Sequence, residues 1–176
     1  MTPADWKIVL DTMEPHGKEW IILGLADAMP SIVDTYEVNT KVRQQHFLAT
    51  VAHESDHFNS TTEYASGRAY EGRKDLGNTM KGDGARYKGR GLIQLTGRYN
   101  YQQASDAFQT DFIKEPDLVS RFPHAATVSA WWWKNHNLNT IADKNDPRAV
   151  CKIVNGGLNG INSRIYLTEI AGIALT

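Results

Sequence analysis

The sequence contains very little cysteine: Cys151 is the one such residue among 176. A single cysteine can form neither an intramolecular disulfide nor a cysteine-only zinc site, and this excludes the secreted scaffolds that disulfides hold together. The mostly apolar segment 149–154 around it also lacks the surroundings of a papain-like or caspase-like nucleophile. We therefore expect Cys151 to be a small core residue and the chain to fold in a reducing cytoplasm.

Long hydrophobic runs are lacking as well. The longest apolar stretch, residues 20–26, is interrupted by Gly24 and falls far short of the roughly 20 residues that span a bilayer. The N-terminus has no basic segment followed by an apolar run, which a secretory signal requires. We therefore expect neither a transmembrane segment nor a signal peptide, so action outside the cytoplasm would need another protein for release.

Neither sign of charge is in excess, since 19 basic residues stand against 20 acidic ones and the net charge is -1. This excludes a general electrostatic attraction to nucleic acid or to an anionic membrane. A length of 176 residues with 41% hydrophobic content is enough for one domain with a core. We expect a single domain over residues 1–176, which a cleft could divide into two lobes.

Helical patterns dominate what is present. Thr2 and Pro3 have the form of a helix start, and Asn39-Thr40 can cap the helix that leads to Glu54. The expected helices cover residues 3–14, 19–28, 31–36, 40–54, 124–135, 147–154 and 162–174. The fold class is therefore mainly α, with at most a small β element near residues 91–95.

The middle of the chain differs in composition. Seven of the 14 glycines lie in residues 72–97, together with several arginines and lysines. The order of a phosphate-binding loop is absent there. We expect these glycines to let the backbone turn tightly and approach a ligand.

Glu54 allows two incompatible interpretations. His53-Glu54-Ser55-Asp56-His57 fits the H-E-x-x-H pattern, in which two histidines on successive helical turns hold zinc and the glutamate activates water. Alternatively, Glu54 is the acid of a glycosidase. Phe47 lies on the expected buried face of this helix. Glu54, seven residues later, falls within about 20° of the same face, where a carboxyl is partly desolvated.

Cleavage of a glycosidic bond with inversion needs a second carboxylate about 6.5–9.5 Å from the acid to activate water. Glu63 stands nine residues after Glu54, beyond a polar run that should leave the helix. Carboxylates on a surface loop are often merely solvated, so the pattern alone does not decide between a two-carboxylate catalytic site and solvated charge.

The residues resemble a specific family. The segments AHES at 52–55, YEGRKDLGN at 70–78 and GDGARYKGRGLIQLTGRYNY at 82–101 are similar to the chitinases and lysozymes of glycoside hydrolase family 19, and above all to compact phage endolysins. A weaker match covers residues 154–160. The resemblance implies a lysozyme-like, two-lobed helical domain with a central cleft.

The resemblance also implies site residues, position by position. Glu54 would be the general acid and Glu63 the general base, with Thr96 helping Glu63 to hold the attacking water. Sugar-binding residues would be Gln94, Asn100 and Asn155, while Arg164 would line the cleft beside the substrate or support the acids through its charge. Amide side chains suit this role because they both donate and accept hydrogen bonds, although Asn155 could equally cap a helix.

The chain departs from the family at Asp56-His57, where many members have Gly-Gly. This change creates the apparent zinc motif, and it adds an acid that could compete with Glu63. Glu71 is another rival, but its context favours pairing with Arg68 or Arg73.

Two other functional classes remain as alternatives. A zinc peptidase would need a third ligand, and no downstream motif supplies one. A catalytically silent sugar-binding module would use tryptophans as platforms, but Trp131-Trp132-Trp133 points around more than half a helix. At least one of these should be core and another a contact between lobes.

We therefore expect a metal-free, cofactor-free, monomeric hydrolase of β-1,4 bonds in peptidoglycan glycan strands, with chitin as the alternative substrate. It would be made in the cytoplasm of a host bacterium and reach the periplasmic wall through a holin, as a phage endolysin does during host lysis. No separate wall-binding module is expected.

Overall fold

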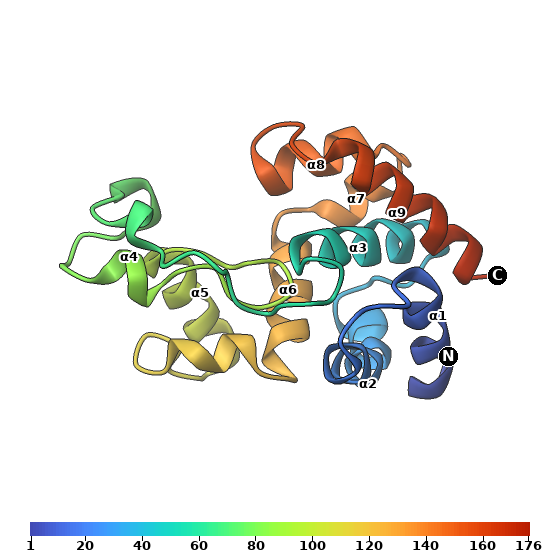
Figure 1. Cartoon of the computed structure of the whole chain (residues 1–176), viewed down its shortest axis with the longest axis horizontal. Coiled ribbons are helices and arrows are strands. Elements are labelled where there is room, and N and C mark those ends of the chain that lie inside the picture. Colours follow the sequence, from blue (N-terminus) through green and yellow to red (C-terminus); the bar gives the residue numbers. More distant parts are fainter.

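The computed structural model describes residues 1–176 and is almost entirely helical (Figure 1). Its α-helices are α1 (Pro3–Met13), α2 (Glu19–Thr35), α3 (Lys41–Glu54), α4 (Asp83–Arg86), α5 (Arg98–Phe108), α6 (His124–Asn135), α7 (Leu138–Ala142), α8 (Pro147–Asn155) and α9 (Ile161–Ala174). Three short 3-10 helices are η1 (Arg68–Tyr70), η2 (Lys74–Leu76) and η3 (Pro116–Ser120). The mainly α class is confirmed. Only isolated bridges, from Arg90 to Thr62 and to Leu95, occur near the expected β element.

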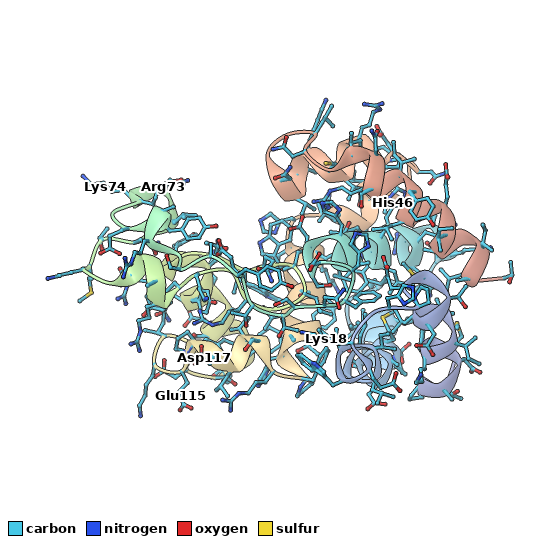
Figure 2. All side chains as sticks on the ribbon, viewed as in Figure 1. Lys18, His46, Arg73, Lys74, Glu115 and Asp117 are labelled. Atoms are coloured by element: carbon cyan, nitrogen blue, oxygen red, sulfur yellow. The ribbon has the colours of Figure 1, made fainter.

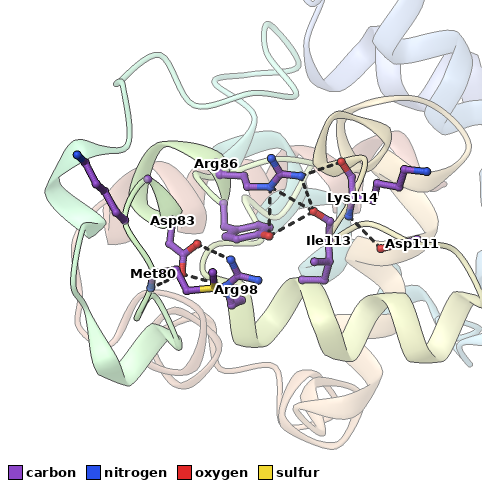
Figure 3. A pocket seen from close by; sticks show the side chains of 10 residues that line it. Met80, Asp83, Arg86, Arg98, Asp111, Ile113 and Lys114 are labelled. Carbon is purple, nitrogen blue, oxygen red and sulfur yellow. Dashed lines mark hydrogen bonds and ion pairs between the residues drawn. The ribbon is translucent and has the colours of Figure 1, made fainter.

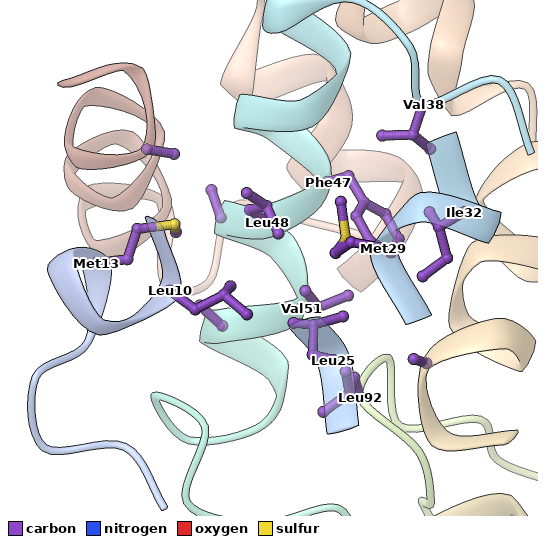
Figure 4. Packing of buried hydrophobic residues seen from close by; sticks show 14 of the residues in the cluster. Leu10, Met13, Leu25, Met29, Ile32, Val38, Phe47, Leu48, Val51 and Leu92 are labelled. Atoms are coloured by element: carbon purple, nitrogen blue, oxygen red, sulfur yellow. The ribbon is translucent and has the colours of Figure 1, made fainter. Parts of the chain in front are cut away.

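The helices form two lobes of unequal size. A large core of 27 buried residues joins α1, α2, α3, α6, α7, α8 and α9, while a core of seven residues lies around α5 and the loops beside it. In Figure 1 the smaller lobe, with α4 and α5, lies at one end, and α6 stands between the lobes. Figure 4 shows Phe47, Leu48 and Val51 of α3 packed between α1 and α2 in the large core. Helix α3 is therefore a rigid support for Glu54 at its end.

The tryptophan triplet of α6 connects the lobes as expected. Trp133 is fully buried, lies 5.6 Å from Phe47 between ring centroids, and donates its indole N–H to Asn139. Trp132 packs against both cores. Cys151 is also fully buried, which confirms its core role. No helix of the chain combines the length and the apolar character that a bilayer crossing requires.

The helix starts follow from local chemistry. The Thr2 hydroxyl accepts a bond from the backbone N–H of Asp5 at 3.3 Å, and the Asp5 carboxylate accepts from the N–H of Thr2 at 2.8 Å. This reciprocal capping box satisfies two N–H groups that the helix leaves free. Thr40 caps α3 by a single bond, in which its hydroxyl accepts from the N–H of Arg43 at 3.3 Å. Both expected caps are confirmed.

The division of residues 19–36 into two helices is wrong. Helix α2 runs without a break through Pro30, although proline removes one backbone hydrogen bond there. Leu25, Met29 and Ile32 continue one buried face across the proline, and each is fully buried. Burial of such side chains contributes about 1.5–3 kcal/mol apiece, which offsets the local cost of proline.

Two helical glycines have opposite surroundings, so alanine should have opposite effects at the two positions. A Cβ on Gly24 would lie 2.3 Å from the Phe122 ring, whereas one on Gly172 would meet the movable amide end of Gln45. We expect Gly24→Ala to destabilise the domain by about 1–3 kcal/mol through overpacking. Gly172→Ala should be neutral or stabilise it by up to about 1 kcal/mol, since alanine favours helix. Urea unfolding of both variants measures the contrast, and equal effects would contradict it.

Candidate active site

The chain turns sharply immediately after α3. Helix α3 ends at Glu54, as predicted, and the next hydroxyl, that of Ser55, donates back to the carbonyl of Val51 at 2.6 Å. Asp56, His57 and Phe58 then adopt left-handed φ angles of 53°, 56° and 59°. Such angles cost a non-glycine residue roughly 1 kcal/mol each. Phe58 is fully buried, so packing in the large core offsets this strain and fixes the turn.

Glu54 projects from the end of α3 toward helix α9. Its side chain is 21% exposed, and Nη2 of Arg164 donates to its Oε1. Arg164 is buried, and its Nε and Nη1 have no hydrogen-bond partner. The Glu54 carboxylate is therefore the hydrogen-bond partner of this guanidinium, and the charge support expected of Arg164 stays a prediction.

Glu63 is held by different groups. The Tyr70 hydroxyl donates to Oε1 and the Gly89 N–H donates to Oε2, each at 3.0 Å. The pKa of Tyr70 is raised by burial and, in addition, by its bond to Glu63. A Cβ on Gly89 would come within 2.8 Å of the Gln94 side-chain oxygen and 3.2 Å of Glu63 Oε2. A larger residue at this position would therefore require the Gln94 and Glu63 side chains to shift.

The two carboxylates face one hollow. It has a volume of about 250 Å³ and is lined by His53, Glu54, Ser55, Asp56, Ser60, Thr62, Glu63, Tyr64 and Gln94. Gln94 comes from the glycine-rich middle section, adopts a φ of 58°, and donates its amide to the Gly91 carbonyl at 2.9 Å. The structure thus brings together Glu54, Glu63 and Gln94, three of the residues expected at the site.

The other four expected residues, Arg164, Thr96, Asn100 and Asn155, do not line this hollow. The Thr96 hydroxyl donates to the Gln94 carbonyl at 2.8 Å, and the Asn100 amide donates to the Thr96 carbonyl at 2.7 Å. This chain of bonds braces the backbone behind Gln94. Asn155, the last residue of α8, donates to the Asn159 carbonyl at 3.3 Å and so ties the loop between α8 and α9.

Glu71, considered a rival base, has a structural partner set. Its oxygens accept the N–H groups of Gly82 and Gly84 at 2.7 and 2.9 Å, and it does not line the hollow. The expected pairing with Arg68 or Arg73 is wrong. Free backbone N–H groups at the start of α4 compete successfully for the carboxylate, since a fixed backbone donor loses no side-chain entropy. Arg73 pairs with Asp75 instead.

The histidines of the apparent zinc motif diverge. Nδ1 of His53 lies 2.9 Å from the Ser163 hydroxyl, whereas Nδ1 of His57 lies 2.6 Å from Glu14. Because α3 ends at Glu54, His57 does not follow His53 on the next helical turn, and no three metal-binding side chains gather anywhere in the chain. Burial and, secondarily, the nearby Arg164 lower the pKa of His53. The geometry that the zinc interpretation requires is therefore missing.

A larger hollow of about 490 Å³ lies on the small lobe between α4, the start of α5 and the segment 111–114 (Figure 3). Asp83 and Arg98 form a 2.6 Å ion pair there, and the Arg98 guanidinium lowers the pKa of the Asp83 carboxyl. Arg86 donates to the carbonyls of Ile113 and Lys114. These charged groups bond mainly to other groups of the protein, and no expected catalytic residue lines this larger hollow. The hollow that Glu54 and Glu63 line is therefore the candidate active site.

Most cations of the middle section are likewise used within the fold. Lys88 donates to the carbonyls of Glu63 and Ala65, and Arg90 pairs with Asp117. Figure 2 places Arg73 and Lys74 at the far tip of the small lobe. The basic composition of this section thus contributes to folding more than to a cationic surface.

The sequence matches the family model described as class I chitinase, glycoside hydrolase family 19, over residues 21–159. The chain belongs to glycoside hydrolase family 19. It is accordingly a glycoside hydrolase of the chitinase type. Family membership and the hollow that Glu54 and Glu63 share point to the same class of reaction.

Relatives of the family 19 chain differ in how much they share with it. A "glycosyl hydrolase family 19 domain-containing protein" of Haemophilus influenzae is 27% identical over 95% of both chains. An endochitinase of Arabidopsis thaliana is 34% identical over 64% of this chain but only 39% of its own length. The chain therefore spans well under half of that plant enzyme.

Solved structures share the two-lobed helical fold. Chitinase C from Streptomyces griseus HUT6037 is 25% identical, with a TM-score of 0.73 over 97% of this chain and 92% of its own. A class IV chitinase of family 19 from Zea mays is 22% identical, with a TM-score of 0.66 over 93% and 84%, and shows likeness of fold alone.

Sequence reasoning missed the groups that hold Glu63. Tyr70 was visible in the motif Tyr70-Glu71-Gly72, but nothing local indicated that its hydroxyl reaches back seven residues. Gly89 was counted among the glycines that allow close approach, which is the role that its N–H and missing side chain have here.

Proposed function

We propose that this family 19 hydrolase cleaves β-1,4 bonds between N-acetylated amino sugars of peptidoglycan, with inversion. The observation that carries the proposal is that Glu54 and Glu63 line one hollow while each has its own partners. Glu54 would donate a proton to the leaving oxygen and Glu63 would take one from the attacking water. Inversion requires one carboxyl group as the acid and one as the base, and the hollow offers both.

The surroundings of each acid fit its proposed part. When Glu54 gives up its proton, negative charge develops beside Arg164, which is already in place and needs no reorganisation. Tyr70 and Gly89 fix both oxygens of Glu63 toward the hollow, which limits where a water can bind. Gln94 offers a sugar both a donor and an acceptor on the same wall.

Peptidoglycan is preferred over chitin on three grounds. The middle motif most resembles compact phage endolysins, and a relative that matches over 95% of its own length is bacterial. The single cysteine also excludes the intramolecular disulfides of secreted plant chitinases. Chitin remains the second candidate because the relatives named for a substrate are endochitinases and chitinases.

The proposed setting is lysis of a bacterial host. The enzyme would accumulate in the cytoplasm, reach the periplasm through a holin and act there as a monomer without a cofactor. We expect its substrate to be the thin peptidoglycan wall in that periplasm.

Mass spectrometry of products from purified peptidoglycan and from chitin hexasaccharide tests the proposal, with and without EDTA. We expect muropeptides with reducing ends and intact stems, unchanged by EDTA, and α-anomeric first products by NMR. If the enzyme cleaved only the chitin hexasaccharide, chitin would replace peptidoglycan as the proposed substrate. Cut stem peptides that EDTA abolishes would overturn the glycosidase assignment.

A further inference from the structure

Tyr64 is unusually open for a large aromatic side chain. It is 75% exposed, follows Glu63 directly in the chain, and lines the candidate active site. A single exposed aromatic residue is ordinary on a protein surface, but one on the wall of a polar hollow that Glu54, Asp56 and Glu63 also line offers an apolar face to whatever binds there.

The Tyr64 ring is nevertheless held at both ends. At its tip, the hydroxyl donates to Asp56 Oδ2 at 2.9 Å, and this bond raises the pKa of Tyr64. At its base, the Lys88 ammonium donates to the carbonyls of Glu63 and Ala65, on either side of Tyr64, at 3.0 and 3.2 Å. The N–H of Glu63 also donates to the Gly89 carbonyl at 2.9 Å. An exposed ring that is fixed in this way loses little entropy when a ligand covers it.

Asp56 reaches the Tyr64 hydroxyl because of its strained backbone. Its φ of 53° belongs to the left-handed turn after Glu54, a region that aspartate tolerates better than most residues. The carboxylate that could have rivalled Glu63 is thus bonded to a phenol on the same wall.

A pyranose ring in the chair form has a face of C–H groups and a rim of polar substituents. The face suits the open Tyr64 ring, while the rim can reach Gln94 and the two glutamates that share the hollow. We propose that Tyr64 is a stacking platform for an N-acetylated pyranose in this hollow, and that Asp56 is the positioning residue that holds the platform.

This inference rests on the proposed function only in that the hollow binds a glycan, and it holds for peptidoglycan and chitin alike. It assigns Asp56 a role other than that of the base.

Binding to the inactive Glu54→Gln protein tests the platform. The probe is tetra-N-acetylchitotetraose or the stem-free peptidoglycan tetrasaccharide, whichever the wild type hydrolyses, in a titration calorimeter. We expect Tyr64→Ala to raise Kd about tenfold, the order expected for loss of one aromatic contact. Tyr64→Trp should bind nearly as well as the parent. Tyr166→Ala, which removes a tyrosine that is 59% exposed on α9, is the matched control and should change nothing.

Kinetics on the active enzyme test the positioning role of Asp56. Asp56→Gly relieves the backbone strain but removes the acceptor, so we expect a several-fold higher KM, an unchanged kcat and a Tm that does not fall. Asp56→Asn keeps an acceptor for the Tyr64 hydroxyl and tolerates the left-handed angle, so its KM should stay close to that of the wild type. In the Tyr64→Ala background, Asp56→Gly should have no further effect on KM.

The outcomes separate the platform from the function beneath it. If the wild type cleaves the glycan but Tyr64→Ala binds it as tightly as the parent, the platform is wrong and the proposed function stands. If kcat rather than KM collapses in Asp56→Gly, Asp56 belongs to the reaction itself and the positioning role is overturned. A wild type that neither binds nor cleaves either glycan removes the proposed function.

Discussion

Glu54→Gln is expected to lower kcat by a factor of about 10²–10⁴, the usual contribution of a positioned acid. The amide has nearly the shape of the carboxyl and its oxygen can still accept from Arg164, but it has no acidic proton for the leaving sugar. Stability and glycan affinity should therefore change little. Initial rates of reducing-end release, thermal unfolding and calorimetric binding together check the three parts of this prediction.

Glu115→Gln is the matched control for the loss at Glu54. Glu115 is exposed, its carboxylate makes no hydrogen bond or ion pair, and it lies outside the hollow of Glu54 and Glu63. Its substitution changes the net charge by the same amount and should leave kcat as it is. A Glu54→Gln enzyme with a tenth or more of wild-type kcat would show that another group donates the proton.

The parts of the fold that the sequence predicts well are those set by neighbours along the chain. Thr2 and Thr40 cap helices because their hydroxyls reach N–H groups three residues away. Helix α3 ends at Glu54 for a similarly local reason, since the hydroxyl of the next residue, Ser55, donates back to the Val51 carbonyl. Pro30 shows the limit, since a local rule ends the helix there and the buried face of α2 continues it.

The site follows the same division. The separation of Glu54 and Glu63 by nine residues fits an acid at a helix end and a second acid on the following loop, and the structure places both in one hollow. Arg164 stands 110 residues from Glu54, so no periodicity could join them, and only family resemblance suggested their contact. Tyr70 was missed because a phenol looks the same in a motif whether it packs or donates.

The departure from the family at Asp56-His57 has a backbone explanation. Both positions have φ angles in the left-handed region, where glycine carries no penalty, which accounts for Gly-Gly in many members. This chain accepts the strain, and each new side chain finds a partner across the turn: Tyr64 for Asp56 and Glu14 for His57. The apparent zinc motif is a consequence of these structural contacts.

Glu63→Ala is expected to lower kcat by about 10²–10⁴-fold, because no carboxylate then takes the proton of the attacking water. The missing side chain leaves room between Tyr70 and Gly89, whose donors would then face an empty space. Azide needs no general base and can attack the anomeric carbon from that side. It should restore turnover and yield an α-glycosyl azide from the β-linked substrate, as NMR of the product can show.

Asp56→Asn is the comparison that decides which acid is the base. Asp56 lines the same hollow, but its Oδ2 is taken by Tyr64, so its amide variant should keep kcat close to that of the wild type. If Asp56→Asn instead lowered kcat as far as Glu63→Ala does, and if azide rescued neither variant or rescued Asp56→Asn alone, the base would be Asp56. A β-glycosyl azide from Glu63→Ala would point to retention, since inversion and retention place the incoming group on opposite faces of the sugar.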